Sequence, residues 1–445
     1  MGVAATTTSD YGAVYRAIGG RSRLAFGIVA AALVYLTYTW FAFDVSGLIA
    51  KAQSDRAVLL GTDAVAHKVH VEKSLRTNEV EVAVEGERTA TYKTPPEWVQ
   101  MKGDLVRVDL GDGYDVEFTG SIVRFFVPGY GLIESRVSRK GVQTVLPPGP
   151  VPDWVSATKV KLSARPTIGR RVQVSRAKIE VHRYFFGWEN FFFPFNSELH
   201  GYSAGELASL AFGGERLRED VPNWRLIFDT FWNNPDWQHG TVAVALWETI
   251  LMAVLGTFTA AFVGLPLAIL AARNFTPSGT LRFFVRRVFD FVRGIDMLIW
   301  SLIFIRAFGL GPLTGALAIA FTDTGSLGKL FSEALENIDN KQVEGVQSTG
   351  ANRLQRYRFG VIPQILPVFL SQGLYYLESN TRSATVIGAL GAGGIGLLLV
   401  ETLRTHRDWE NTLYIIILTI VVVIMMDSLS GFLRRRLIQG KETTS

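Results

Sequence analysis

The sequence predicts an all-α polytopic membrane domain of six spans, with an inserted β-rich domain that lies outside the cytoplasm. Three observations lead to this fold class. Long apolar runs with few charges occur near the start of the chain and again in its last two fifths. Basic residues gather at every second connection between those runs. The segment between the first two runs alternates polar and apolar residues, which is typical of strands.

Composition restricts the chemistry that the chain can perform. Its 445 residues suffice for a membrane domain and one soluble domain. The absence of cysteine excludes disulfides, thiolate metal sites and a cysteine nucleophile, and the six histidines are scattered. We therefore expect no catalytic residue, no metal site and no cofactor bound by this chain. The net charge of +5 is modest, and the positions of the charges are more informative than their sum.

Six apolar segments have the length and composition of transmembrane helices. A bilayer core needs about 20 apolar residues in a helix. The first segment, residues 24–43, contains no charge, and we read it as an anchor rather than a cleaved signal peptide because no small-residue cleavage pattern follows it. The second, residues 242–272, is interrupted only by Glu248. The others are residues 289–308, 312–330, 362–399 and 412–433.

The distribution of arginines sets the orientation of these spans, because cytoplasmic loops carry an excess of basic residues. The connections "GLGP" and "RTHRDWEN" are short and less basic than the others. Six spans with both termini inside satisfy the pattern, so we predict cytoplasmic ends at residues 1–23 and 437–445. The basic clusters are Arg16, Arg21 and Arg23; Arg273, Arg282, Arg286 and Arg287; Arg353, Arg356 and Arg358; and Arg434, Arg435 and Arg436.

Residues 44–240 form the predicted extracytoplasmic insert. The stretches "EVEVAVEGERTATY", "DLVRVDLGDGYDVEFTG", "IVRFFVPG", "KVKLSA" and "RRVQVSRAKIEVHRYFF" read as half-buried strands. Asp112 and Gly113 lie between two alternating runs, which indicates a hairpin. We therefore expect a small antiparallel β domain.

Two other features of the insert invite an interpretation. His67 and His70 have the spacing of a helical metal pair, but a zinc site needs three or four ligands, so we expect solvated histidines. The aromatic stretches that follow the strands favour interfacial helices, because an apolar ring with one polar atom is stable at a membrane surface. Packing inside the β domain is the alternative. The tryptophans concerned are Trp188, Trp224, Trp232 and Trp237.

The stretch "GALGAGGIGLLL", residues 388–399, matches the spacing G-x-G-x-x-G of a dinucleotide-binding turn. Such a turn needs a strand before it and a βαβ continuation after it, whereas this chain continues into another apolar span. Glycines in a membrane helix instead allow close packing or a break beside a cavity. We assign that role, beside a translocation pathway, to Gly391, Gly393, Gly394 and Gly396.

The connection between the fourth and fifth spans, residues 331–361, is long, charged and basic. It contains Glu344, followed six positions later by Gly350. The aliphatic–proline pair Ile362 and Pro363 comes next. This spacing resembles the EAA loop of ABC-importer permeases, in which short cytoplasmic coupling helices dock in a groove of the ATPase subunit. A basic loop held by lipid headgroups is the alternative.

The resemblance implies that this loop moves as a rigid lever with its bend at Gly350. Glu344 and the neighbouring arginines would supply charged contacts. The chain departs from the motif at Gly345 and Val346, where the family has two alanines, and at Gly360, where it has an aliphatic residue. The coupling residues implied are Glu344, Gly350, Arg353, Arg356, Ile362 and Pro363.

Further stretches, such as "ETILMAVLGTFTAAFVGLPLAILAARN" and "NTRSATVIGALGAGGIGLLLVETL", are similar to the phosphonate ABC-transporter permease family. The similarity covers approximately residues 188–436. It implies a type I importer fold, with the permease domain at residues 242–436, in the bacterial inner membrane. The implied partners are an ATPase dimer, an extracytoplasmic binding protein, a second permease chain as a homodimer, and membrane lipid, but not nucleic acid.

The chain lacks the Walker A pattern, so we expect no enzymatic activity, and a partner ATPase would use ATP and Mg. Charges within spans usually line a bundle interior. Those present are Asp296, Arg306 and the pair Glu378 and Arg382, which lie four residues apart. Arg382 either contacts a transported anion or only pairs with Glu378.

The sequence leaves the substrate open among phosphonate, phosphite, phosphate and another small anion. It also leaves open the role of the insert and the choice between homodimer and heterodimer. Two rival classes remain. A membrane enzyme would need a catalytic constellation, and no histidine–carboxylate cluster lies at one depth in these spans. A membrane channel or a sensor with an external ligand domain would not explain the EAA-like spacing.

Overall fold

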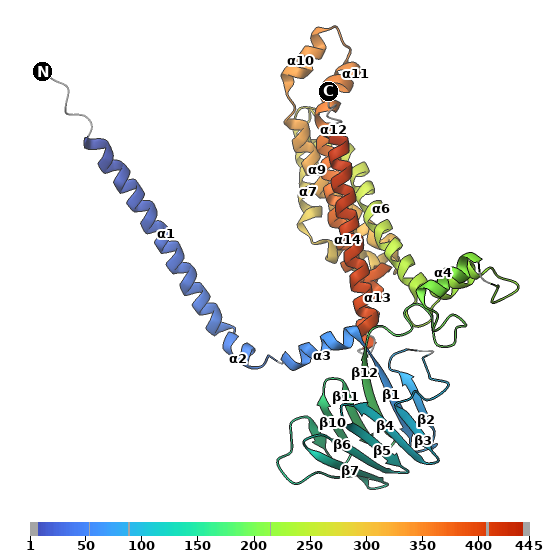
Figure 1. Ribbon diagram of the computed structural model, residues 1–445. Helices are drawn as coiled ribbons and strands as arrows, with labels where there is room; N and C mark the ends of the chain where they lie inside the picture. The colour runs from blue at the N-terminus through green and yellow to red at the C-terminus, as the bar shows by residue number, and fades with distance from the viewer. Residues whose placement is uncertain (1–7, 53, 88–89, 214, 406–408, 439–445) are drawn as a thin grey trace. The chain divides into compact units, whose positions relative to one another are not determined.

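The computed structural model describes residues 8–52, 54–87, 90–213, 215–405 and 409–438 (Figure 1). The outermost parts of the two ends predicted to be cytoplasmic, residues 1–7 and 439–445, lie outside the described residues. The chain divides into two compact units, Met1–Gly61 and Thr62–Ser445.

The first unit is helical. Helix α1 (Thr8–Ala42) contains the predicted first span, because its part Leu24–Ala42 is apolar over 19 residues and is not buried by any described part of the chain. A helix that is apolar on all sides is stable where lipid surrounds it. Asp44 caps the N-terminus of helix α2 (Val45–Ala50), because its carboxylate accepts a hydrogen bond from Gly47 N at 3.1 Å. Helix α3 (Ser54–Val65) leads into the second unit.

The second unit begins with a β domain of two antiparallel six-stranded sheets (Figure 1). One sheet has the order β2-β1-β12-β11-β10-β9, and the other is a meander from β3 to β8. The predicted antiparallel β domain is therefore confirmed, and its extracytoplasmic position stays a prediction. The strands are β1 (Ala66–Ser74), β2 (Val80–Val84), β3 (Val99–Lys102), β4 (Leu105–Gly111), β5 (Tyr114–Thr119), β6 (Ile122–Val127), β7 (Gly131–Ser138), β8 (Gly141–Val145), β9 (Val155–Ala157), β10 (Lys161–Thr167), β11 (Arg170–Ser175) and β12 (Lys178–Phe186).

Alternation of side chains builds the core of this domain. In β4, every second side chain points inward, and residues from both sheets share one apolar cluster that includes Phe118 and Phe125. The predicted hairpin between β4 and β5 is present. Asp112 (φ 51°) and Gly113 (φ 80°) both adopt the left-handed conformation that a tight hairpin turn requires. Arg170 of the other sheet forms an ion pair with Asp112.

The remainder of the second unit is helical. Two short helices come first, and a long apolar helix, α6, follows them. The helices are α4 (Ala204–Gly213), α5 (Asn223–Trp232), α6 (His239–Ala271), α7 (Gly279–Gly294), α8 (Met297–Phe308), α9 (Pro312–Glu336), α10 (Asn340–Ser348), α11 (Arg353–Arg356), α12 (Ile362–Ile387), α13 (Gly394–Thr405) and α14 (Trp409–Ile438). Two π-helical turns, η1 (Tyr357–Val361) and η2 (Gly388–Ala392), adjoin the two ends of α12.

Small residues allow α6 and α9 to pack closely. A Cβ on Gly264 would lie 3.3 Å from the backbone nitrogen of Gly328, and one on Gly256 would lie 2.6 Å from Ile319. Such close approach of two backbones is how helices associate in lipid, where burial of apolar surface gives little drive. Helix α7 is amphipathic, and its apolar residue Phe289 packs against Gly328 of α9.

The predicted third span is wrong as a single helix. Residues 289–308 are divided between α7 and α8, because Ile295 has an extended backbone (φ −106°, ψ 132°) and the Asp296 carboxylate caps α8 by accepting from Leu298 N at 2.8 Å. Among the described residues, three helices are long and apolar enough to cross a membrane, and the bent pair formed by α12 and α13 would be a fourth. The count of six spans stays a prediction.

The expectation of solvated histidines is wrong for His67, and His70 is partly exposed. His67 and His70 lie on β1, where residues three apart point to opposite faces. The His67 side chain is buried and its Nδ1 lies 3.0 Å from the carbonyl oxygen of Gly187. His70 is opposite His182 in the sheet. Among the described residues, no group of three or more possible ligands could hold a metal ion.

Neither interpretation describes all four tryptophans. Trp237 is buried and packs on Trp188, with ring centroids 5.1 Å apart. The interfacial assignment is therefore wrong for Trp237. Trp224 and Trp232, on α5, are 60% and 38% exposed, and for them an interfacial position stays a prediction.

Candidate functional site

A break interrupts the fifth apolar segment at the glycines that the sequence singles out. The α12 and α13 portions of this segment are bent by 59° with respect to each other. Gly391 (φ 113°), Gly393 (φ 86°) and Gly394 (φ 67°) adopt left-handed conformations that only glycine enters without strain. We call residues 388–394 the glycine break. The predicted helix break is thus present, and its place beside a translocation pathway stays a prediction.

Gly396 has a different reason to be glycine. It lies in the first turn of α13, and a Cβ there would be 1.9 Å from the carbonyl oxygen of Thr385. Gly388 is similarly crowded, because a Cβ there would be 2.4 Å from the carbonyl oxygen of Gly393. The end of α12 and the start of α13 therefore approach each other closely around the break.

Two side chains of α6 accept hydrogen bonds from the backbone N–H groups at the start of α13. The first N–H groups of a helix have no partner within the helix. Glu248 Oε2 accepts a hydrogen bond from Gly394 N at 3.0 Å, and Thr249 Oγ1 accepts one from Ile395 N at 2.9 Å. From the sequence alone, Glu248 is only an interruption of an apolar run. The available signal was a single carboxylate within a long apolar helix.

A buried polar cluster connects three helices and was also missed. The amide of Asn380 on α12 donates to Asp323 Oδ2 on α9 at 2.5 Å and to Thr257 Oγ1 on α6 at 2.9 Å. All three side chains are buried. Polar groups at such a depth are expensive unless they are hydrogen-bonded to one another, so the cluster fixes the packing of the three helices.

The charges predicted to line the pathway are not brought together. Asp296 caps α8, and Arg306 is exposed in the last turn of the same helix. On α12, the pairing expected from the spacing of Glu378 and Arg382 is present, with 3.3 Å between Glu378 Oε1 and Arg382 Nη2. Arg434 Nη2 of α14 lies 3.9 Å from the other carboxylate oxygen of Glu378. Glu378 thus lies between two guanidinium groups.

The loop between α9 and α12 has the geometry of a helix–turn–helix. Gly350 (φ 83°) lies between α10 and α11, so the predicted bend is present. Asn352 and Gln355 form a reciprocal capping box that starts α11. Glu344 is exposed, and Arg356 Nη1 donates to Gln347 Oε1 at 3.1 Å.

An open groove accompanies this loop and presents no charged side chain among its described lining residues. They are Gln342, Gly345, Val346, Thr349, Gly350, Ala351, Gln355 and Phe359. Figure 1 shows α10 and α11 at the end of the helical bundle remote from α13.

The loop is attached to the start of α12 by two contacts. A Cβ on Gly360 would lie 3.2 Å from the Cα of Val343, so α10 packs directly on the backbone before α12. Gln364 of α12 accepts a hydrogen bond from Asp339 N at 2.8 Å. These two contacts join α10 to the start of α12. Ile362 and Pro363, the predicted aliphatic–proline pair, are the first two residues of that helix.

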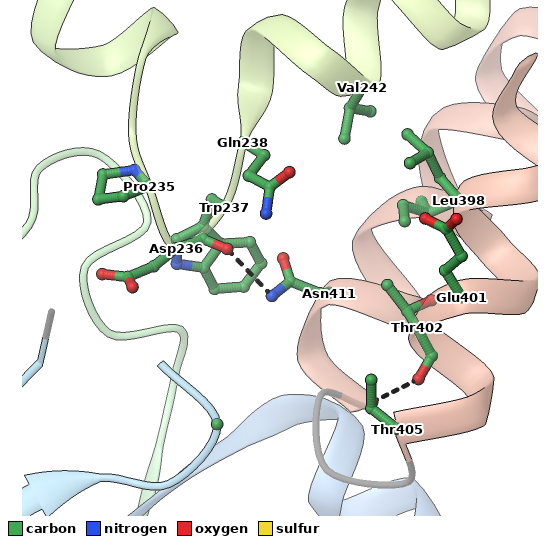
Figure 2. A pocket seen from close by; sticks show the side chains of 12 residues that line it. Pro235, Asp236, Trp237, Gln238, Val242, Leu398, Glu401, Thr402, Thr405 and Asn411 are labelled. Atoms are coloured by element: carbon green, nitrogen blue, oxygen red, sulfur yellow. Dashed lines mark hydrogen bonds between the residues drawn. The ribbon is translucent and has the colours of Figure 1, made fainter. Parts of the chain in front are cut away.

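A separate pocket of about 170 Å³ lies where the segment before α6 meets α13 and α14 (Figure 2). Asn411 Nδ2 donates to the carbonyl oxygen of Asp236 at 3.4 Å across it. Glu401 and Asp236 are among its lining residues, and the described lining contains no lysine or arginine. We do not assign a transported anion to this pocket.

Glu87 is held near the same junction, and it carries a pH prediction. Asn190 Nδ2 donates to Glu87 Oε2 at 2.6 Å. Burial, together with the nearby carboxylates of Asp236, Glu189 and Glu410, raises the pKa of Glu87 to about 8, although the hydrogen bond from Asn190 acts in the lowering direction. A group whose pKa is higher when folded binds more protons in the folded state, so the free energy of unfolding falls as the pH rises from about 5 to 8.

We expect Glu87→Gln to remove this part of the pH dependence. Thermal unfolding of the purified chains at pH 6 and pH 9 measures the effect. The drop in Tm between these two pH values should be larger in the wild type than in the variant, by at least about 2 °C. Glu81→Gln, at an exposed position of β2, is the matched control and should behave as the wild type does. An unchanged pH profile in Glu87→Gln contradicts the assignment.

Comparison with known proteins defines the class. Residues 264–439 match the family described as the binding-protein-dependent transport system inner membrane component. A putative phosphite transport system permease of Stutzerimonas stutzeri is 34% identical over 194 residues, which are 44% of this chain and 68% of that protein. The chain therefore belongs to this family of inner membrane transport components.

Within the family, the chain is similar to permeases of phosphorus oxyanion systems. A putative cryptic phosphonate transport system permease of Escherichia coli is 47% identical over 122 residues, which are 27% of this chain and 99% of that protein. A phosphate-import permease of Mycolicibacterium smegmatis is 39% identical over 191 residues, 43% of this chain, and the match spans only 36% of that protein's length.

Solved structures give weaker likenesses. A crystal structure of an amino acid ABC transporter aligns with a TM-score of 0.39 and 17% identity, over 44% of this chain and 94% of that chain. An inward-facing structure of a methionine ABC transporter aligns with the same TM-score and 18% identity, over 44% of this chain and 95% of that chain.

Proposed function

We propose that the chain is the permease subunit of an ABC importer that moves phosphonate, or the related oxyanions phosphite and phosphate, across the cytoplasmic membrane. The observation that carries the proposal is the similarity to permeases named for phosphonate, phosphite and phosphate systems. We further propose a homodimer of this chain, an ATPase pair that uses ATP and Mg, and an extracytoplasmic binding protein as partners. Both termini lie in the cytoplasm in this proposal.

The proposed mechanism is alternating access driven by the ATPase. The groove on α10 and α11 is the docking surface for the ATPase, with Glu344, Arg353 and Arg356 as charged contacts beside it. ATP binding moves the loop, and the contact between Val343 and Gly360 passes the movement to α12. Helix α12 leads to the glycine break, so the movement reaches the point where α12 and α13 are bent with respect to each other.

Gly350→Arg tests the coupling role. Its positive φ costs an arginine about 1 kcal/mol, and no atom lies within 4 Å of the added Cβ, so the chain should still fold while the bend changes. We expect uptake to fall by at least about tenfold while insertion in the membrane is retained. A backbone strain of about 1 kcal/mol changes the folding equilibrium by less than tenfold, so loss of folded protein alone would not explain such a fall in uptake. Membrane-fraction blots and uptake assays measure the two quantities.

Gly205→Arg is the matched control. Gly205 lies in α4, outside the loop, is exposed and also has open space around its Cβ, so uptake should persist. Unchanged uptake by Gly350→Arg refutes the coupling assignment.

The substrate and the class of protein need a separate experiment. The complex, purified with its ATPase and reconstituted in vesicles, is tested for stimulation of ATP hydrolysis by phosphonates, phosphite and phosphate, each with candidate binding proteins. Stimulation by one oxyanion identifies the substrate. A chain that fails to co-purify with any ATPase supports the channel or sensor class instead.

A further inference from the structure

Glu248 is the one carboxylate on the apolar helix α6. The sequence of α6 contains no other acidic residue and no lysine or arginine. A carboxylate within an apolar membrane helix is costly and is retained where it has a partner or a function. Its partner here is the backbone of the glycine break.

The contact has the form of a helix cap supplied by another helix. Because residues 391–393 leave the helical path, the N–H groups of Gly394 and Ile395 lack acceptors within their own helix. Glu248 and Thr249, adjacent on α6, provide both acceptors. The negative charge of Glu248 is also favourable at the positive end of the α13 dipole.

Close approach makes the contact specific. A Cβ on Gly394 would lie 2.5 Å from Thr249 Oγ1, so only glycine allows α13 to begin here. The Thr249 hydroxyl donates to Ala245 O at 2.9 Å, which fixes its direction toward Ile395.

The loop between α8 and α9, together with Pro312 at the start of α9, bounds the break on another side. Cβ atoms on Gly391 and Gly393 would lie 2.7 Å from Leu310 and 3.4 Å from Pro312. The break is therefore enclosed by α6 and by this loop, and Glu248 is its charged contact.

We propose that Glu248 is a positioning residue for transport, whose carboxylate fixes the start of α13 on α6 and so keeps ATP hydrolysis coupled to movement of the break. The expected loss of coupling rests on the proposed transport function, whereas the hydrogen bond between Glu248 and Gly394 can be tested without a transport assay. Glutamine at this position retains an oxygen that can accept from Gly394 N, and alanine does not.

The experiment compares Glu248→Ala, Glu248→Gln and the control Glu401→Ala in the full complex. Glu401 is an exposed carboxylate on α13 itself. Hydrogen–deuterium exchange of the segment 388–399 reports the contact directly. We expect exchange about tenfold faster in Glu248→Ala, within about threefold of wild type in Glu248→Gln, and unchanged in the control.

Uptake and ATP hydrolysis, measured on equal amounts of assembled complex, report the consequence. The ratio of anion transported to ATP hydrolysed should fall by about tenfold in Glu248→Ala and recover in Glu248→Gln. If Glu248→Ala does not assemble, Thr249→Val against Thr249→Ser removes and restores the neighbouring acceptor in the same assays.

Equal exchange in Glu248→Ala and wild type overturns the contact, and an unchanged transport ratio overturns its role. Equal losses in the glutamine and alanine variants also overturn the role proposed for the hydrogen bond. If the wild-type complex moves no phosphorus oxyanion, the proposed function fails, and the exchange result alone decides on the contact.

Discussion

Replacing Gly396 by alanine is expected to abolish transport and to lower the yield of folded protein. The added methyl group would lie 1.9 Å from the carbonyl oxygen of Thr385 and 2.7 Å from Ala389 N. Both atoms belong to the backbone, so no side-chain rotation relieves the clash, and the turn between α12 and α13 must open. Overpacking of this kind costs on the order of 3 kcal/mol or more.

The measurements are uptake in cells and Tm of the purified chain. Gly373→Ala is the matched control, because Gly373 lies within α12 and a Cβ there would have no atom within 4 Å. Alanine is the better helix former by about 1 kcal/mol, so this variant should be at least as stable as the wild type. Normal transport by Gly396→Ala would show that the fold around the break differs from the one described.

Replacing Asn380 by leucine is expected to destabilise the helical bundle more than most single substitutions. The change removes the donor to Asp323 and leaves that carboxylate buried without the amide at 2.5 Å. Loss of a partner by a buried charged group costs about 3 kcal/mol or more. Thermal unfolding in detergent and the yield of monodisperse protein measure the effect.

A second replacement distinguishes the hydrogen bond from simple misfit. The double variant Asp323→Leu with Asn380→Leu should recover part of the stability, because replacing both polar partners is less costly than orphaning one. Thr381→Val is the control, since the buried Thr381 hydroxyl donates only within its helix, to Leu377 O at 3.0 Å. A double variant that is less stable than either single variant contradicts the pairing.

The features that the sequence predicted are those that depend on neighbours in the chain. The hairpin at Asp112 and Gly113, the bend at Gly350 and the pairing of Glu378 with Arg382 each follow from a local spacing. The glycine break belongs to the same class, because left-handed backbone conformations select glycine one residue at a time.

The features that it did not predict depend on how distant helices pack. Glu248 meets Gly394 across 146 residues, and Asp323 meets Asn380 across 57. No spacing within one helix reveals such partners. For His67 and His70 a local spacing was misleading. Their spacing of three suggested one face of a helix, whereas they lie on β1, which pairs with β2 and β12. Their burial is therefore set by pairing with strands distant in the sequence.

The two π-helical turns bear on the way α12 can move. With 26 residues, α12 is about 39 Å long. A π-helical turn holds an extra residue and has a weaker hydrogen-bond pattern than the α-helix, and such turns occur at functional sites. Torsion about the long axis of α12 would thus be absorbed at η1 and η2, and the helix between them could rotate as one rigid segment.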